Sequence, residues 1–230
     1  MDDLTILYYT ANKIDEGFAR RIRAHLLQTV DWRAPIVSVS QQPIPLGKNI
    51  MVGDVGCSAW VCYWQILTAA KEAETEFVAC AEDDSLYTWE HFRHRPDGNA
   101  FAYNKNRWII EDMSAPRPRF RWRDRTGMCG CIAPRKLMVE TLETRFEKFP
   151  EPIRTTYDPR LTGWGEPGRY ERYLKLPQVG IQFFWPEQPI LTFNHKKGLG
   201  GLRRPSGDDK IETSLKPWGN AKEVWNFYHG

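Results

Sequence analysis

The sequence predicts an α/β domain in which a sheet is covered by helices. Short apolar runs alternate with longer helical patterns through about the first third of the 230 residues, which is typical of parallel strands joined by helices. Hydrophobic residues make up 41% of the chain, enough to bury a core. A chain of this length fits one α/β domain.

Three strands and two helices are expected in the first 81 residues, from apolar runs and from apolar residues repeating about every four positions. In order, they are a strand over Leu4–Thr10, a helix from Asp15 to Val30, a strand over Pro35–Ser40, a loop over Leu46–Gly56, a helix over Cys57–Ala73 and a strand over Phe77–Ala81. Right-handed crossovers place the carboxyl ends of such strands at one edge of the sheet, where ligands of open α/β sheets bind.

The second half of the chain is less regular. Strands are expected at Phe101–Tyr103, Arg107–Ile110, Gly127–Ala133, Gln182–Trp185 and Ile190–Phe193, and helices over Pro134–Phe146, in the later part of Gly163–Leu176 and within Trp218–Gly230. Residues 196–210 form a basic, glycine-rich loop.

Charge is distributed unevenly along the chain. Residues 1–90 hold 7 Lys and Arg against 13 Asp and Glu, and residues 91–230 hold 25 against 16. A positive second half suits an anionic partner, such as a nucleotide diphosphate or a nucleic acid. No apolar stretch reaches the roughly 18 residues of a membrane span, and the amino-terminus has no secretory signal pattern. The five cysteines match no zinc-site spacing, and a cytoplasmic protein is expected.

Three consecutive carboxylates, Glu82, Asp83 and Asp84, follow the third strand directly. Carboxylates this close repel one another unless a cation neutralises them. Oxygen ligands suit Mg²⁺ or Mn²⁺, which bridge protein carboxylates to substrate phosphates. The alternative is a solvated acidic turn, but the position at the end of a central strand favours a ligand site.

With its first strand close to the amino-terminus and a later strand ending in Glu-Asp-Asp, the sequence resembles the GT-A glycosyltransferases. The resemblance implies a single domain over residues 1–230, with a Rossmann-like mixed sheet flanked by helices. Residues 1–90 would bind a nucleotide-diphosphate sugar, with UDP-sugars favoured, and residues 91–230 would bind the acceptor. Glu82 or Asp83 would face the ribose or the metal, and Asp84 would ligate Mn²⁺ or Mg²⁺ directly. The loop Thr10-Ala11-Asn12 would hold the nucleotide base.

Two later segments also resemble elements of that family. Gly163-Trp164-Gly165-Glu166 is similar to its Trp-Gly-Glu/Asp element, in which Trp164 and Gly165 would shape the acceptor pocket and Glu166 would be the general base. Because Pro167-Gly168-Arg169 replaces the second acid often found there, Glu171 and Asp158 are substitute candidates. In the other segment, His195 would be a further metal ligand, and a mobile loop would contact the diphosphate through Lys196, Lys197, Arg203 and Arg204.

Five arginines recur at every second position of APRPRFRWRDR: Arg117, Arg119, Arg121, Arg123 and Arg125. In an extended segment they would share one side, about 6.6–6.8 Å apart, and a row of guanidinium groups suits a phosphate chain. We therefore take a nucleic acid as a hypothesis for the acceptor, specifically a hydroxymethylated pyrimidine in DNA flipped from the stack by a phage-type enzyme. The alternative is a solvated edge strand protected by its charge. A protein, a lipid-linked sugar or a free saccharide also stays open as the acceptor.

Two other functions are weighed against sugar transfer. A metal-dependent nucleotidyltransferase would also place carboxylates after a strand, but it needs a glycine-rich phosphate loop that Thr10-Ala11-Asn12 does not supply. A non-catalytic nucleic-acid-binding module built on the arginines would bind DNA without a divalent metal. The acidic triplet argues against it, because those charges repel phosphate when no metal is present.

Overall fold

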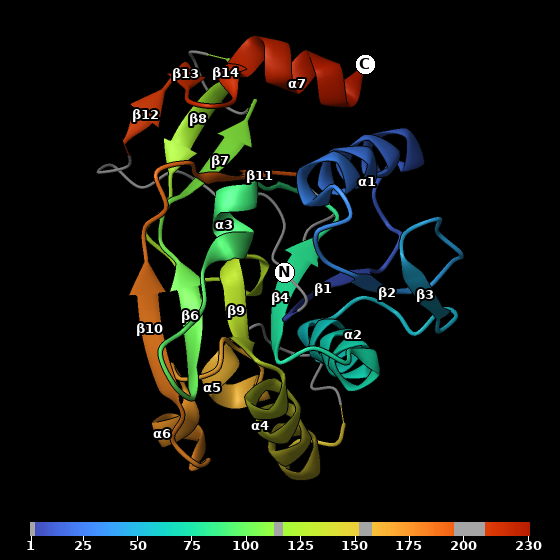
Figure 1. Cartoon of the computed structure of the whole chain (residues 1–230), viewed down its shortest axis with the longest axis vertical. Coiled ribbons are helices and arrows are strands. Elements are labelled where there is room, and N and C mark those ends of the chain that lie inside the picture. The colour runs from blue at the N-terminus through green and yellow to red at the C-terminus, as the bar shows by residue number, and fades with distance from the viewer. Residues whose placement is uncertain (1–2, 113–116, 152–157, 196–209) are drawn as a thin grey trace.

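The computed structural model describes residues 3–112, 117–151, 158–195 and 210–230, which form two main sheets with helices packed against them (Figure 1). The larger sheet has seven strands in the order β10-β6-β9-β4-β1-β2-β3. Four of them run parallel: β1 (Leu4–Thr10), β2 (Ile36–Ser40), β3 (Lys48–Met51) and β4 (Phe77–Glu82). This arrangement places Thr10 and Glu82 at the same edge, as the sequence predicted.

The other three strands make the sheet mixed. β9 (Cys131–Pro134) lies antiparallel between β4 and β6 (Ala100–Asn104), and β10 (Gly180–Phe184) runs parallel to β6 at the edge. The mixed α/β fold is therefore confirmed. The sheet also runs without a break through the two halves that the sequence analysis separated at residue 90.

Helices cover both faces of this sheet because the side chains of β1 alternate. Leu4, Ile6 and Tyr8 pack with α1 (Glu16–Val30) in one hydrophobic cluster, while Leu7 and Tyr9 pack in another with α2 (Ala59–Glu72) and α4 (Arg135–Lys148). Asp15 and Ser58 cap the amino-termini of α1 and α2 through their side-chain oxygens. Because α1 and α2 each pack a buried face on the sheet, their positions relative to the carboxyl ends of the strands are fixed.

A second, five-stranded sheet lies beside the carboxyl end of β4. Its order is β12-β8-β7-β11-β5, with strands β12 (Ile211–Glu212), β8 (Arg119–Trp122), β7 (Arg107–Glu111), β11 (Ile190–Phe193) and β5 (Ser85–Leu86). The carboxyl-terminal helix α7 (Ala221–His229) packs on α1 and on this sheet through Phe193 and Tyr228 (Figure 1). The sequence analysis did not predict this as a separate sheet.

The remaining described elements are short. They are α3 (Trp89–Arg93), the 3₁₀ turn η1 (Met128–Gly130), α5 (Pro159–Thr162), α6 (Glu171–Leu174), β13 (Ser214–Leu215) and β14 (Gly219–Asn220). The predicted loop over Leu46–Gly56 was wrong in part, because Lys48–Met51 pairs with β2 as an edge strand. None of the helices in the described ranges has the length and apolar character needed to cross a bilayer.

The arginines of β8 do not form an exposed row. Arg119 and Arg121 share one side of the strand, as predicted, but only 6% and 3% of their surfaces are exposed. Both pair with the buried carboxylate of Glu111 on β7, at nitrogen–oxygen distances of 3.1 and 3.0 Å. Asn194 also donates to Glu111. These two arginines are therefore part of the core, and their predicted role as an acceptor-binding surface is corrected.

We expect Glu111→Ala to lower the free energy of unfolding by about 3–5 kcal/mol, because it leaves two buried guanidinium groups without their shared carboxylate. Urea denaturation of purified protein measures this change. Glu74→Ala, which removes an exposed acid, is the matched control and should change stability by less than about 0.5 kcal/mol. Equal effects of the two substitutions would contradict a structural role for the Glu111 cluster.

Candidate active site

A cavity of about 780 Å³ opens where the carboxyl ends of β1 and β4 meet the second sheet. This volume lies within the range of small-molecule binding sites, about 300–1,000 Å³. Residues from distant parts of the chain line it, including Thr10, Ala11, Lys13, Glu82, Asp83, Asp84, Arg107, Arg123, Arg125, Glu166, Arg169, Thr192 and His195. The cavity therefore brings together most of the described residues that the sequence analysis singled out.

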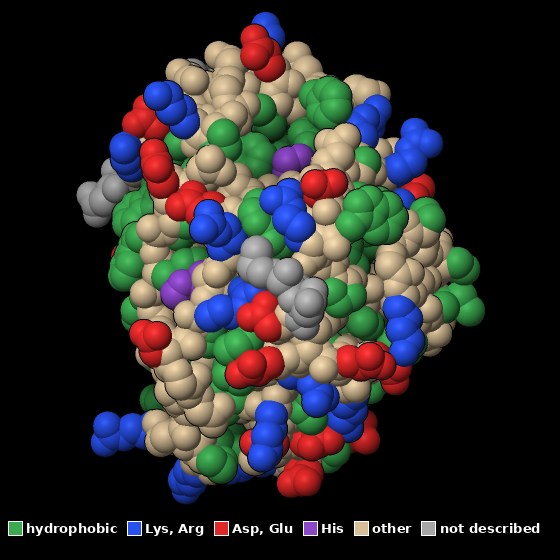
Figure 2. Space-filling model, viewed as in Figure 1, with side chains coloured by type: hydrophobic (Ala, Val, Ile, Leu, Met, Phe, Trp, Pro, Cys, Tyr) green, Lys and Arg blue, Asp and Glu red, His purple; other side chains and the backbone are tan. Residues whose placement is uncertain are grey.

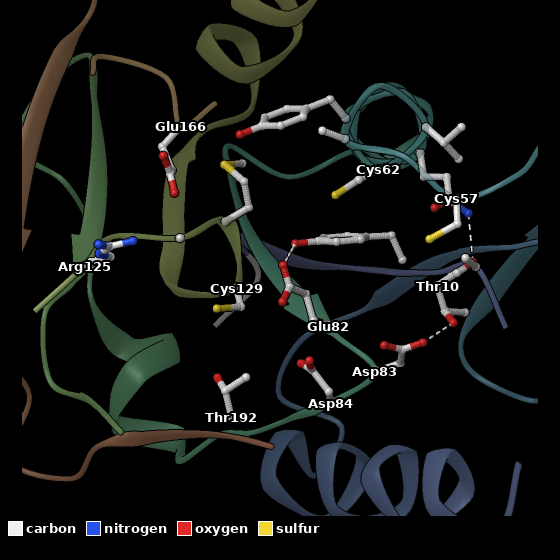
Figure 3. Close-up of a pocket in the computed structure, with 18 of the residues that line it drawn as sticks. Thr10, Cys57, Cys62, Glu82, Asp83, Asp84, Arg125, Cys129, Glu166 and Thr192 are labelled. Carbon is white, nitrogen blue, oxygen red and sulfur yellow. Dashed lines mark hydrogen bonds between the residues drawn. The ribbon is translucent and has the colours of Figure 1, made fainter. Parts of the chain in front are cut away.

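The three predicted carboxylates all reach this cavity, but each has a different environment. Glu82 ends β4 and accepts a hydrogen bond of 2.7 Å from the Tyr9 hydroxyl. Asp83 accepts one from Thr10 Oγ1, and Asp84 lies 3.2 Å from His195 Nε2 through Oδ2. Figure 3 shows the three side chains side by side along one wall. Asp83 and Asp84 form the turn between β4 and β5, and all three carboxylates are partly buried at the cavity wall.

Strand pairing explains how His195 reaches Asp84 across 111 residues of sequence. β5 follows the acidic triplet and pairs antiparallel with β11, with Ser85 opposite Thr192. The backbone N–H of Phe193 then donates to the Asp84 carbonyl at 2.8 Å. The chain leaving β11 is thereby directed past the carboxylates, and His195 follows two residues later.

The electrostatics of this wall favour a cation. Burial, together with the negative charge of Asp84, raises the pKa of Asp83 to about 6. Burial alone would lower the pKa of His195, but its hydrogen bond to Asp84 and the nearby negative charges raise it above its ordinary value. Negative charge at the site contributes to both pKa shifts, although burial is the larger cause for Asp83.

A divalent ion would find two protein ligands here. Within the described ranges, no group of three or more His, Cys, Asp or Glu side chains is arranged to hold a metal. Asp84 and His195 nevertheless lie together at the cavity wall, with 16% and 20% of their side chains exposed. Mg²⁺ keeps several waters and substrate phosphates among its ligands and needs only one or two carboxylates. Asp84 supplies the carboxylate that such an ion needs, and the imidazole nitrogen of His195 is a ligand that suits Mn²⁺ better than the harder Mg²⁺.

The loop after β1 has a mainly structural arrangement. Asn12, predicted to contact a nucleotide base, is not part of the cavity lining. Its Oδ1 accepts hydrogen bonds from the backbone N–H groups of Gln41 and Gln42, at 2.8 and 3.0 Å, which ties this loop to the end of β2. Thr10 and Ala11 do line the cavity, as do Lys13 and Ile14 of the same loop, so Asn12 is the one predicted residue here that lies away from it.

Glu166 points into the cavity from the loop between α5 and α6 (Figure 3). Its neighbours hold it there. The carbonyl of Gly165 accepts a hydrogen bond from the buried Arg145, and Arg169 donates to Thr126 at 2.8 Å. The side chain of Glu166 is 21% exposed, and its Oε2 lies 3.6 Å from Nη1 of Arg169. It is an accessible carboxylate on a fixed loop.

The two substitute candidates for the base are placed elsewhere. Glu171 is buried and paired with the fully buried Arg145, so it is committed to the core. Asp158 caps α5 and pairs with Arg160, and hydrogen bonds from Arg160 lower its pKa to about 2. Neither residue lines the cavity, which corrects both predictions.

Trp164 does not shape an acceptor surface either. Its side chain is 3% exposed and packs on Tyr63 and Phe146 in the cluster under α2 and α4. Gly165 lies so close to Tyr170 and Pro159 that a Cβ there would come within 2.7 Å of both. The two residues hold the Glu166 loop against the core, and their predicted acceptor contacts are corrected to a positioning role.

The sequence analysis named Arg123 and Arg125 as candidate anion-binding residues, but it missed Arg107 and Arg169 in the same cavity. Arg107 opens β7, is 5% exposed, and still lines the cavity together with Arg123, Arg125 and Arg169. The sequence did contain a signal for Arg107, because it stands directly before the apolar run Trp108–Ile110. A charged side chain is costly to bury unless it interacts with another group. Arg117 is exposed and is not part of the lining. The predicted diphosphate contacts Lys196, Lys197, Arg203 and Arg204 lie outside the described residues.

Comparisons with known proteins agree with this geometry at the level of fold. No protein-family model matches the sequence, and no curated protein matches it. The structure is similar to a glycosyltransferase involved in glycosylation of the major capsid of PBCV-1, with a TM-score of 0.50 and 12% identity over 83% of this chain and 92% of that one. It is equally similar to S. aureus TarS 1–349 in complex with UDP-GlcNAc, with a TM-score of 0.50 and 13% identity over 85% of this chain and 60% of that one. The chain therefore has the fold of these two glycosyltransferases.

Proposed function

We propose that the protein is a metal-dependent glycosyltransferase that moves a sugar from a nucleotide-diphosphate sugar to a hydroxyl group. One observation carries the proposal: the cavity has Asp84 and His195, 3.2 Å apart, on one wall and the carboxylate of Glu166 on the other. The fold shared with two glycosyltransferases, one of them in complex with UDP-GlcNAc, supports this assignment and favours a UDP-sugar as the donor.

In the proposed reaction, the bond from the anomeric carbon to the diphosphate oxygen breaks and a bond to the acceptor oxygen forms. Glu166 takes the acceptor proton as the hydroxyl attacks. Asp84 and His195 would hold Mn²⁺ or Mg²⁺, which would stabilise the negative charge of the departing diphosphate. Glu82 and Asp83 are fixed by Tyr9 and Thr10 and would orient the donor beside that ion.

The acceptor is a separate part of the proposal. A hydroxymethylated pyrimidine in DNA is the most specific acceptor that the sequence suggested, but its support is reduced because Arg119 and Arg121 are buried. On the face drawn in Figure 2, basic and acidic side chains are interspersed, and its described residues form no broad basic patch. Arg123 and Arg125 remain within reach of a ligand, because they line the cavity.

A thermal-shift screen of UDP-, GDP- and other nucleotide sugars, with and without Mn²⁺, tests the proposed function. A donor present at 100 times its dissociation constant stabilises the native state by about 2.7 kcal/mol. We expect a rise in melting temperature with one nucleotide sugar, and a smaller rise when EDTA replaces Mn²⁺. Release of the nucleoside diphosphate in the presence of acceptor would complete the test.

The same screen, extended to nucleoside triphosphates and oligonucleotides, separates the two alternatives. A nucleotidyltransferase would be stabilised by nucleoside triphosphates and would release pyrophosphate. A nucleic-acid-binding module would be stabilised by oligonucleotides without a divalent metal and would not respond to nucleotide sugars. Stabilisation by no nucleotide sugar under any condition would contradict the proposed function.

A further inference from the structure

The cavity is divided by charge. The acidic wall holds Glu82, Asp83 and Asp84, with Thr10 beyond it, while Arg125 lies with Glu166 at the opposite end (Figure 3). Arg107 donates to the Arg125 carbonyl, Arg169 Nη1 lies 3.6 Å from Glu166 Oε2, and both arginines also line the cavity. Arg107, Arg125 and Arg169 therefore bring three guanidinium groups to this end, which is more positive charge than Glu166 alone balances, although the charge of Glu82 also acts on Arg107.

Arg107 is buried, and no carboxylate in the described part of the chain pairs with it directly. Nη1 donates to the Arg125 carbonyl at 3.0 Å, and among the described residues Nε has no hydrogen-bond partner although it is fully enclosed. A buried polar atom without a partner is costly and calls for an explanation. A ligand that brings negative charge to this end of the cavity would compensate the buried guanidinium.

The backbone around Arg107 leaves room for its guanidinium. A Cβ at Gly127 would lie 2.6 Å from Arg107 Nη1, and one at Gly130 would lie 3.3 Å from its Cδ. Gly127 has a φ of −166°, which any residue can adopt, so glycine is needed here for space rather than for backbone conformation. These glycines let the chain pack closely on Arg107 at the cavity wall.

The position of Arg107, Arg125 and Arg169 indicates whether they face the donor or the acceptor. The donor diphosphate, in the proposed function, is held at the acidic wall beside Asp84 and His195. The acceptor hydroxyl must instead approach Glu166, because a general base acts within about 3 Å of the proton it takes. Arg125 lies at the Glu166 end (Figure 3), and Arg169 lies 3.6 Å from Glu166.

We propose that the acceptor carries an anionic group, a phosphate or a carboxylate, near its reacting hydroxyl, and that Arg107 and Arg125 bind this group. The inference rests on the proposed function, because it assigns the two ends of the cavity to donor and acceptor. Arginine is suited to the role, since its planar guanidinium binds either anion through paired hydrogen bonds.

A matched set of three sugars tests the proposal: glucose, glucose 6-phosphate and glucuronic acid. Each is titrated calorimetrically into protein saturated with UDP and Mg²⁺, so that the donor site is filled. We expect one of the two charged sugars to bind at least about tenfold more tightly than glucose, which distinguishes phosphate from carboxylate as the recognised group. Equal binding of all three sugars would overturn the proposal.

Arg125→Gln is the informative variant because Arg125 is exposed and should not be needed for folding. In this variant the charged sugar should bind no more tightly than glucose, and the affinity for UDP should be unchanged. Gly127→Ala, which displaces Arg107, should weaken binding of the charged sugar in the same way. Arg20→Gln, on the exposed side of α1, is the control and should change neither affinity.

The outcomes separate this inference from the proposed function. If UDP binds but Arg125→Gln leaves the charged sugar unaffected, the acceptor inference fails alone. If no nucleotide binds at all, the proposed function fails first. An oligonucleotide that displaces glucose 6-phosphate would support the inference, with a nucleic-acid phosphate as the source of the anion.

Discussion

Replacing Asp84 with alanine is expected to lower kcat for sugar transfer by about a hundredfold to a thousandfold, the range seen when one group that stabilises transition-state charge is removed. Asp84 is the carboxylate that lies beside His195 at the cavity wall, with an Oδ2–Nε2 distance of 3.2 Å. Of the two proposed metal ligands, Asp84 and His195, Asp84 is the one with a negative charge. The substitution would therefore leave the ion with the imidazole of His195 alone. Transfer measured over a range of Mn²⁺ concentrations tests this, and the variant should also lose the metal-dependent part of donor stabilisation.

Loss of activity in this variant should not result from unfolding. Burial and the Asp84 charge raise the pKa of Asp83 to about 6, so removing Asp84 relieves repulsion in the metal-free protein. We expect the melting temperature of metal-free Asp84→Ala to stay close to that of the wild type, because this relief offsets the lost contacts of Asp84 with His195 and Ser85. Asp97→Ala, which removes an exposed acid in a distant turn, is the control and should keep full activity. Full transfer by Asp84→Ala in EDTA would refute the metal site.

The buried strands of the first half of the fold could be predicted from sequence because each had a local signal. Buried parallel strands form continuous apolar runs, and β1, β2 and β4 lie within one residue of their predicted bounds. β3 has no such run, because its four residues are intermediate or exposed at the edge of the sheet. β5 and β12 have only two residues each, and strands this short are defined by pairing with distant partners.

The site could be predicted only where topology determines position. The strand order alone brings Glu82 and Thr10 to one edge. Alternation along β8 correctly places Arg119 and Arg121 on one side, but it does not reveal that Glu111 covers that side. That information depends on the pairing of β7 with β8, which no local pattern encodes.

Glu166→Gln should reduce kcat by about a hundredfold to ten-thousandfold, the usual contribution of a general base, while leaving donor affinity unchanged. The glutamine has nearly the same shape, so Arg169 and Thr126 can still hold the loop. Single-turnover transfer and thermal shifts with UDP measure the two effects separately. Unchanged kcat in this variant would show that the reaction does not use Glu166 as its base.

The other two carboxylates first considered for this role provide the decisive comparison. Glu171→Ala should lower the free energy of unfolding by about 3–5 kcal/mol, because it leaves the buried Arg145 unpaired, and any lost activity should follow the folded fraction. Asp158→Ala removes a helix cap, costs about 1 kcal/mol and should retain transfer. Of these three carboxylates, only Glu166 combines exposure in the cavity with a fixed loop, so among the three only its removal should reduce kcat at constant stability. Assigning Glu166 as the base therefore requires both kcat and the free energy of unfolding of each variant. Activity alone cannot distinguish a lost base from a smaller folded fraction.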